Sequence, residues 1–405
     1  YADIVAGGGW ATIEPRSVRR GAAGPTVQQL KQRLALEGYY QGPVDDAFGR
    51  DFEEAVRLYQ RTHQLEDDGV SSRAFWESVN VSAEQRLAQI DLTLQRWRES
   101  RIGDDTDYIH VNIPDFHAEV WRGGERAMRF RVVVGNTQRV CDPRRRRMVY
   151  ANATPLQSSV LDTVVVNPFW NVPRRIVEEE LLPALERDPT YFERSGFERT
   201  SEDSSSVRQL PGRSNPLGRV KFLFPNPHAT YLHDTSRPQY FDFPVRAFSH
   251  GCMRVQDPMA LLEHLLTHDG QYNEREIERA LGRTYERPYS LSTPIPIHIE
   301  YFVVRVDDEG HVHFLSDIYR YDRERLDPSF VPNERCTPPP VGARLVLGDG
   351  HTVMYRDSEG NRYTREQWEY VQSGGTLERR RDGSFEDPPR LAAPADPVAA
   401  DDFGP

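Results

Sequence analysis

The sequence predicts an α+β multidomain protein, in which a small three-helix domain precedes a β-rich domain with a helical insertion. Three observations support this fold class. The chain has 405 residues, which is too long for one small core. Apolar residues recur at helical spacing over residues 21–80 and alternate with a period of two from Tyr108 onward. A helical pattern interrupts the strands at about residues 168–215.

These changes of pattern divide the chain into segments. They are, in order, an irregular lead-in over 1–20, the helical domain over 21–80, a connecting helix over 81–103, the β-rich domain over 104–325 with its insertion at 168–215, and a partly disordered extension over 326–405.

The helical domain begins with Val27, Leu30 and Leu34, whose spacing predicts a helix that ends at Gly38, a residue suited to the C′ position. A second apolar stripe and a third short helix, capped by Ser71 or Ser72, complete the domain. The second stripe comprises Phe52, Val56 and Tyr59.

The connecting helix and the strands follow in order. Ser82 and Gln85 form a capping box, which predicts a helix over 82–100. Alternating apolar residues predict the strands, and the run at 174–186 predicts a helix inside the insertion. The predicted strands cover residues 108–113, 116–121, 128–134, 163–166, 295–306 and 311–315.

The candidate site surrounds Cys252, one of three cysteines in the chain. His233 lies 19 residues before it and Gly251 directly precedes it. A thiol, an imidazole that can accept its proton and a backbone free to aim N–H groups at an oxyanion are what a cysteine nucleophile needs. Strands over 229–233 and 245–248, joined by a turn, would bring the base to the thiol.

A helix begins at Asp257 and Pro258, a few residues after Cys252, and its N-terminal dipole would favour a thiolate. Two other interpretations stay open. Cys252 and His233 could be buried structural residues. His233, Asp234, His250 and Cys252 could instead bind a metal, but the paired short spacings of common zinc sites are missing, so we expect neither metal nor cofactor.

The run SHGCMR at residues 249–254, preceded by His233, resembles the signature of the L,D-transpeptidases, the cysteine enzymes that crosslink peptidoglycan. Further motifs are similar to the large Gram-negative YcbB-type branch, which has a YkuD-type catalytic domain. They lie at residues 167–173, 215–222, 224–226 and 231–235. The resemblance covers about residues 108–322, and the segment after about 331 matches no family.

The turns of the helical domain resemble those of the three-helix peptidoglycan-binding domain. The similar segments are Gly38-Tyr39-Tyr40, Asp45 with Phe48-Gly49, and Ala55-Val56 with Tyr59-Gln60. The alternative is a helical bundle without a ligand, because apolar stripes form cores by default.

The L,D-transpeptidase resemblance implies a sandwich-like catalytic domain whose insertion caps the active site. It implies that Cys252 attacks a tetrapeptide stem, releases the terminal D-Ala and forms a thioester, which an amine of an acceptor stem then attacks. His233 is the base, and the N–H groups of Gly251 and Cys252 stabilise the oxyanion. His250 orients groups or contacts substrate, and Ser249 orients an imidazole. The substrate-binding candidates are Arg254, Tyr231, Asp234 and Trp170.

Arg254 could bind a carboxylate bidentately or be structural, and Trp170 could line a cleft or belong to a core. Carbapenem-type β-lactams are the covalent inhibitors that the resemblance implies, and its cellular role is cell-wall biogenesis and cell shape. Two alternative functions remain. Water in place of the amine gives an L,D-carboxypeptidase or endopeptidase with the same Cys–His site. A decayed site gives a non-catalytic peptidoglycan-binding protein.

Composition sets further bounds. The 51 basic and 62 acidic side chains give a net charge of −11, so we expect no nucleic-acid partner, and we interpret the arginines at 144–147 as a solvated loop. No apolar run reaches the ~20 residues of a membrane span. Tyr1 is not a natural start, so we expect a processed or truncated form, located in the periplasm or cell envelope of a Gram-negative bacterium. In an oxidising compartment Cys141 and Cys336 could form a disulfide; otherwise both are reduced and buried.

Overall fold

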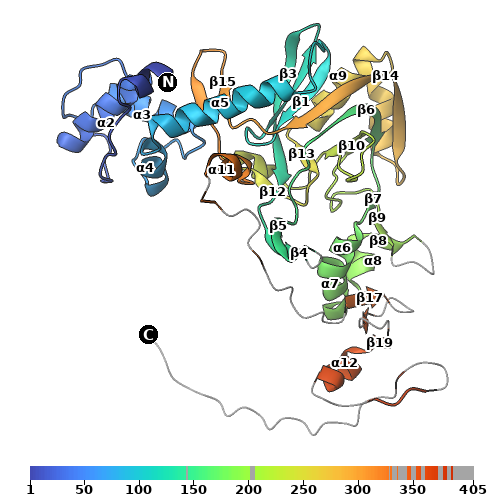
Figure 1. Cartoon of the computed structure of the whole chain (residues 1–405). Coiled ribbons are helices and arrows are strands. Elements are labelled where there is room, and N and C mark those ends of the chain that lie inside the picture. Colours follow the sequence, from blue (N-terminus) through green and yellow to red (C-terminus); the bar gives the residue numbers. More distant parts are fainter. Residues whose placement is uncertain are drawn as a thin grey trace. The chain divides into compact units, whose positions relative to one another are not determined.

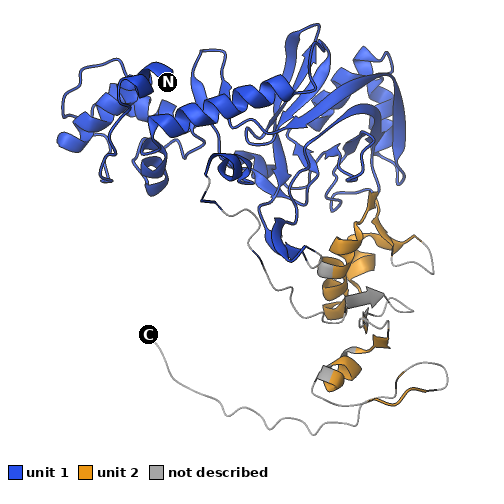
Figure 2. Ribbon diagram, in the orientation of Figure 1, with its two compact units in different colours: residues 1–169, 211–337 blue, residues 170–210, 338–405 orange. Residues whose placement is uncertain are grey.

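The computed structural model describes residues 1–142, 145–200, 206–327, 329–330, 335, 344–347, 353–356, 361–372, 377–380 and 385 (Figure 1). The chain forms two compact units (Figure 2). The first unit comprises residues 1–169 and 211–337, and the second comprises 170–210 and 338–405. No helix in the described part of the chain is long and apolar enough to cross a membrane.

The first unit begins with helix α1 (Ala2–Ala6), where the sequence analysis expects an irregular lead-in. Three helices follow, and local contacts set two of their ends. Gly38 adopts φ +83° after the first helix, and the Ser72 side chain accepts the Phe75 N–H at the start of the third. Buried Leu30, Tyr59 and Phe75 belong to their shared core. The helices are α2 (Pro25–Leu36), α3 (Arg50–Thr62) and α4 (Arg73–Val79).

Helix α5 (Ala83–Glu99) carries the predicted capping box of Ser82 and Gln85. In Figure 1 it runs from the helical domain to the strands of the β-rich domain. The guanidinium of Arg96, near its end, donates to the Tyr301 carbonyl at 2.8 Å and pairs with Asp322 at 2.5 Å. These contacts anchor the helix to the β-rich domain.

The helical domain also contacts the β-rich domain of the same unit directly. The Tyr39 hydroxyl donates to the Val312 carbonyl at 2.9 Å. The Gln64 side chain donates to the Pro114 carbonyl at 2.6 Å and accepts the Ser316 N–H at 2.8 Å. Hydrogen bonds between side chains and backbone groups therefore join the two domains of this unit.

In the described part of the chain, nine strands form one sheet in the order β12-β3-β13-β11-β10-β6-β14-β1-β2. Strand β2 also pairs with β3, so the sheet closes on itself around the largest apolar core. The strands are β1 (Tyr108–Asn112), β2 (His117–Arg122), β3 (Glu125–Gly135), β6 (Gln157–Val166), β10 (Val220–Leu223), β11 (Leu232–His233), β12 (Ala247–Ser249), β13 (Met253–Val255) and β14 (Arg287–Glu300).

Shorter elements surround the sheet. Asp257 caps helix α9 (Pro258–His268) through the Ala260 N–H, as its sequence predicts, and the helix buries four leucines in the core of the sheet. The other helices are α10 (Glu274–Leu281), α11 (Tyr321–Leu326) and the 3₁₀ helix η2 (Pro238–Asp242). Two hairpins pair β4 (Arg139–Asp142) with β5 (Arg147–Tyr150) and β15 (Val304–Val306) with β16 (Val312–Phe314).

The second unit contains the insertion. It is not purely helical, since three strands of two or three residues form a sheet in the order β7-β9-β8. Strands this short leave little periodicity in the sequence. The insertion elements are β7 (Trp170–Asn171), α6 (Arg174–Ile176), the π-helix η1 (Val177–Leu181), α7 (Leu182–Arg187), α8 (Tyr191–Ser195), β8 (Phe197–Arg199) and β9 (Val207–Gln209).

The same unit includes elements from the C-terminal extension. Strands β17 (Arg344–Leu347), β18 (Val353–Arg356) and β19 (Arg362–Tyr363) form an antiparallel sheet, and helix α12 (Arg365–Gln372) follows. The Tyr355 hydroxyl donates to the Glu186 carboxylate of the insertion at 2.9 Å. The final segment, predicted to be disordered, lies outside the described residues. The predicted fold class is thus confirmed: a helical N-terminal domain followed by a β-rich domain.

Candidate active site

Two neighbouring strands bring the predicted site together. Strands β11 and β13 run parallel, with Leu232 opposite Met253 and His233 opposite Arg254. Leu232 and Met253 are fully buried in the core of the sheet. Because side chains alternate along a strand, the intervening residues share the other face. These residues are Tyr231, His233, Cys252 and Arg254.

Cys252 is a free, half-buried thiol. Its Sγ lies 3.8 Å from the Ala229 carbonyl oxygen and interacts with the backbone and hydroxyl of Tyr231. Burial raises the pKa of this thiol to about 11, against smaller opposing effects of Tyr231 and the Arg254 charge. The thiol is therefore protonated at neutral pH.

Helix α9 begins at Pro258, and strand β13 lies between it and Cys252 in the sequence. The effect of a helix dipole falls off within the first turn. Stabilisation of a Cys252 thiolate by this helix end therefore stays a prediction.

His233 is 4 % exposed and held in one tautomer. Its Nδ1 lies 2.5 Å from the Asp234 carbonyl oxygen, which can only accept, so Nδ1 carries the proton and Nε2 is left as the basic nitrogen. Burial lowers the pKa of His233 to about 3, and the Arg254 charge acts in the same direction. The imidazole is therefore neutral, which is the form that can accept a proton.

The Asp234 carboxylate is held by hydrogen bonds from the loop around it. Its carboxylate accepts the Arg219 N–H at 2.8 Å, the Arg219 Nε–H at 3.1 Å and the Thr235 N–H at 2.7 Å. A Cβ on Gly218 would lie 2.5 Å from the same carboxylate, so this loop requires glycine there. Asp234 therefore braces the loop beside His233, and its substrate contact stays a prediction.

The turn before Cys252 is braced by Ser249. Its Oγ accepts the Gly251 N–H at 3.2 Å and donates to the Cys252 carbonyl at 2.5 Å. Gly251 has φ +117°, a conformation that favours glycine. Ser249 therefore stabilises this turn and does not orient an imidazole, and the Gly251 N–H is already paired. Within the described residues, the Cys252 N–H has no hydrogen-bond partner and remains as an oxyanion donor.

Arg254 is the cation of this face. Its guanidinium lies 5.3 Å from the ring centroid of Tyr240, and its buried Nε and Nη1 lack hydrogen-bond partners in the described part of the chain. Tyr240 was missed by sequence reasoning, because a tyrosine in a turn carries no signal of its own. Unpaired N–H donors on a cation suit an anionic group.

The remaining predicted residues lie in different surroundings. The Tyr231 ring contacts the His233 ring edge at 5.7 Å between centroids, and its hydroxyl lies at the Cys252 thiol. His250 is exposed on the turn. Trp170 belongs to the second unit, where it packs on Phe197 at 6.3 Å. The structure thus assembles Tyr231 with the thiol, and a substrate role for Trp170 stays a prediction.

The alternative metal site is not favoured by the donor positions. Among the described residues, the donors close enough to share an ion belong to Asp307, Glu309 and His311, in the hairpin of β15 and β16. The four residues around Cys252 do not form such a group. Cys141 is disulfide-bonded. Cys336, its predicted partner, lies outside the described residues.

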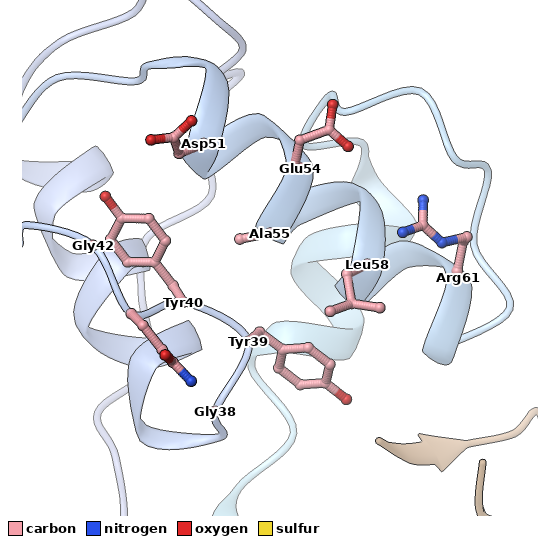
Figure 3. A pocket seen from close by; sticks show the side chains of 10 residues that line it. Gly38, Tyr39, Tyr40, Gly42, Asp51, Glu54, Ala55, Leu58 and Arg61 are labelled. Atoms are coloured by element: carbon pink, nitrogen blue, oxygen red, sulfur yellow. The ribbon is translucent and has the colours of Figure 1, made fainter. Parts of the chain in front are cut away.

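The helical domain contains an open cavity of about 450 Å³ (Figure 3). Tyrosine rings form part of its wall, while acidic and basic side chains come from helix α3. Figure 3 shows these side chains around the hollow. They include Tyr39, Tyr40, Asp51, Glu54, Leu58 and Arg61. A hollow with aromatic faces and polar groups suits a polar ligand with some apolar surface.

Comparisons with known proteins assign the β-rich domain and the helical domain each to a family. Residues 106–317 match the YkuD family, the L,D-transpeptidase catalytic domain. Residues 23–78 match the family described as "Putative peptidoglycan binding domain". Since peptidoglycan lies outside the cytoplasmic membrane, the two matches indicate an extracytoplasmic location at the cell wall.

One curated relative is a Haemophilus influenzae protein named "Putative L,D-transpeptidase". It is 32% identical over 265 residues, which cover 61% of this chain and 50% of the relative. The chain therefore spans about half the length of this relative. The YcbB-type branch stays a prediction.

Two solved structures are similar at low levels. An L,D-transpeptidase from Xylanimonas cellulosilytica has 15% identity and a TM-score of 0.25, covering 71% of this chain and 98% of that one. The Ldtfm-avibactam carbamoyl enzyme has 11% identity and a TM-score of 0.24, covering 48% of this chain and 49% of that one. The YkuD match covers more than half of the residues, and the chain therefore belongs to the L,D-transpeptidase family.

Proposed function

We propose that this protein is an L,D-transpeptidase that crosslinks peptidoglycan stem peptides through a thioester on Cys252. The observation that carries the proposal is the face shared by β11 and β13. It combines a free thiol with a buried neutral imidazole whose Nδ1 proton is fixed on the Asp234 carbonyl. A neutral imidazole can accept the thiol proton, which a cysteine nucleophile requires.

In the first step, His233 Nε2 takes the proton of Cys252 as Sγ attacks the carbonyl carbon of the third stem residue. The thiol pKa of about 11 and the imidazole pKa of about 3 make the resting pair neutral. The proton therefore moves as the C–S bond forms. The Cys252 N–H stabilises the oxyanion, and the imidazolium then protonates the departing D-Ala nitrogen, leaving the thioester.

In the second step, an amine of an acceptor stem attacks the thioester carbon. His233 takes a proton from this amine and returns it to Sγ as the C–S bond breaks, so the crosslink forms and the thiol is restored. Water in place of the amine would release a tripeptide, which is the carboxypeptidase outcome.

Arg254 supplies charge and donors to this reaction. The unpaired N–H groups of its Nε and Nη1 suit the terminal carboxylate of the donor stem, which would hold the scissile bond near Cys252. The cavity of the helical domain would hold peptidoglycan at a second place on the same chain. The periplasm of a Gram-negative bacterium is the location that we propose.

The test is intact mass after incubation with a carbapenem, for the wild type and for Cys252→Ala. The same proteins are then given a disaccharide-tetrapeptide. An adduct on the wild type alone, with a crosslinked dimer as product, supports a transpeptidase. An adduct with only a tripeptide product indicates a carboxypeptidase. Neither adduct nor product would overturn the catalytic proposal and leave a wall-binding protein.

A further inference from the structure

A threonine far from the motif lies against the turn that carries the nucleophile. Thr154 is fully buried and follows strand β5. Its Oγ1 donates to the Gly251 carbonyl at 2.9 Å and accepts the Gly135 N–H at 2.9 Å. Both the donor and the acceptor function of this hydroxyl are therefore used.

The bond to Gly251 has a geometric consequence for Cys252. The Gly251 carbonyl and the Cys252 N–H belong to one planar trans peptide group and point in opposite directions. A hydroxyl that holds this carbonyl from the interior therefore turns the Cys252 N–H away from the interior. The next peptide group is held as well, since the Cys252 carbonyl accepts from Ser249 and the Met253 N–H donates to Tyr231.

Thr154 is itself held in place. The Tyr319 hydroxyl accepts the Thr154 N–H at 3.1 Å and donates to the Gly135 carbonyl at 2.6 Å. A Cβ on Gly135 would lie 1.8 Å from the Asn152 carbonyl oxygen, so only glycine lets the segment of Thr154 approach strand β3 so closely. The hydroxyl cannot turn away without breaking this set of bonds.

We infer that Thr154 is a positioning residue for the acyl-transfer reaction. By holding the Gly251 carbonyl, it fixes the peptide group whose N–H, that of Cys252, stabilises the oxyanion. The inference rests on the proposed function, because an oxyanion forms only when Cys252 attacks a carbonyl. Thr154 touches neither substrate nor the reacting atoms and acts through the Gly251–Cys252 peptide group.

A purely structural role makes a different prediction. Loss of a buried hydrogen bond alone would lower the melting temperature. It would either leave acylation and alkylation of the Cys252 thiol unchanged or change both rates together. Loss of positioning would slow acylation, which passes through an oxyanion, and spare alkylation by iodoacetamide, which does not. Comparing the two rates on one variant therefore separates the roles.

The experiment measures both rates by intact mass for the wild type, Thr154→Val, Thr154→Ser and Thr93→Val. Thr93 is a buried threonine of helix α5 whose hydroxyl has no partner among the described residues, so it controls for the same chemical change. We expect carbapenem acylation of Thr154→Val to be about 10- to 100-fold slower, because removal of a whole oxyanion donor costs about 100- to 1,000-fold. Alkylation stays within about twofold of the wild type.

Thr154→Ser keeps the hydroxyl and should restore most of the acylation rate, while Thr93→Val should acylate like the wild type. If Thr154→Val does not fold, Tyr319→Phe decides, because it removes the two bonds that hold Thr154 and Gly135. Slower acylation with unchanged alkylation supports the inference in either variant. Equal acylation, or a parallel loss of both rates, overturns it. A wild type that forms no adduct instead overturns the proposed function.

Discussion

Two buried histidines, one in each domain of the first unit, show what separates a catalytic imidazole from a structural one. His63 Nδ1 lies 2.9 Å from the Tyr59 carbonyl, and His233 Nδ1 lies 2.5 Å from the Asp234 carbonyl. Burial is the main cause that lowers the pKa of both groups. The two imidazoles thus share burial, tautomer and neutral charge.

Their neighbours differ. His63 stacks on Tyr59 at 3.7 Å, and its buried Nε2 has no hydrogen-bond partner in the described part of the chain. His233 lies on the face that carries Cys252 and Arg254. The comparison indicates that a lowered pKa and a fixed tautomer prepare a base, and that a nucleophile on the same face gives the base its function.

The strongest challenge to this comparison is to remove each histidine. We expect His233→Gln to slow carbapenem acylation of Cys252 by at least about 100-fold, because the general base is lost. Cys252→Ala should form no adduct. His63→Gln should acylate within a few-fold of the wild type, while its melting temperature falls because a stacked core ring is lost. Intact mass over time measures acylation. A folded His63→Gln that is as slow as His233→Gln would contradict the distinction.

A substitution of Arg254 tests whether its charge lowers the pKa values of His233 and Cys252. Its charge lowers the pKa of both His233 and Cys252, so Arg254→Gln should raise both pKa values. We expect the alkylation rate of wild-type Cys252 to rise with pH toward about 11, and the profile of Arg254→Gln to lie at still higher pH. Arg237→Gln, an exposed neighbour of Tyr240, is the matched control. A profile of Arg254→Gln that coincides with the wild type would rule out this role.

The two histidines should contribute in the same direction to the pH dependence of stability. Both have a pKa below the ordinary value when folded, so the unfolded chain binds more protons as the pH falls below about 6.5. Their contribution to stability is full above about 6.5 and is lost between there and the folded pKa, about 3 for His233.

Thermal melts between pH 4 and 8 measure this effect, at up to about 1.4 kcal/mol per pH unit for each group. The acid slope of His63→Gln should be shallower than that of the wild type. Equal slopes would mean that folding does not lower the pKa of His63.

The smallest expected effect concerns the cavity of the helical domain. Glu54→Lys places a longer cation on its exposed wall and should weaken binding to isolated peptidoglycan by about 3- to 10-fold, about 1 kcal/mol. Acylation of Cys252 should not change. Glu14→Lys, another exposed glutamate outside the cavity, controls for the charge change. Sedimentation with peptidoglycan measures the binding, and equal binding by both variants would remove the cavity from the proposal.

Much of the fold follows from local sequence. Helices α5 and α9 begin where Ser82 with Gln85 and Asp257 with Pro258 predict them, because a cap forms between residues at most a few positions apart. The short strands β7, β8 and β9 were missed, because two or three residues show no period. The lead-in contains helix α1, which its glycine-rich continuation does not suggest.

The chemistry that is available can be read from the order of residues: a cysteine after a glycine, a histidine 19 residues earlier, and the strands and helix that flank them. Which groups are paired and which remain available depends on the folded chain. It paired Asp234 with Arg219, closed the Gly251 N–H onto Ser249, and brought Thr154 to a carbonyl 97 residues away. The physical reason is that caps depend on neighbours within one turn, whereas these hydrogen bonds depend on strand register and on close approach between segments distant in the chain.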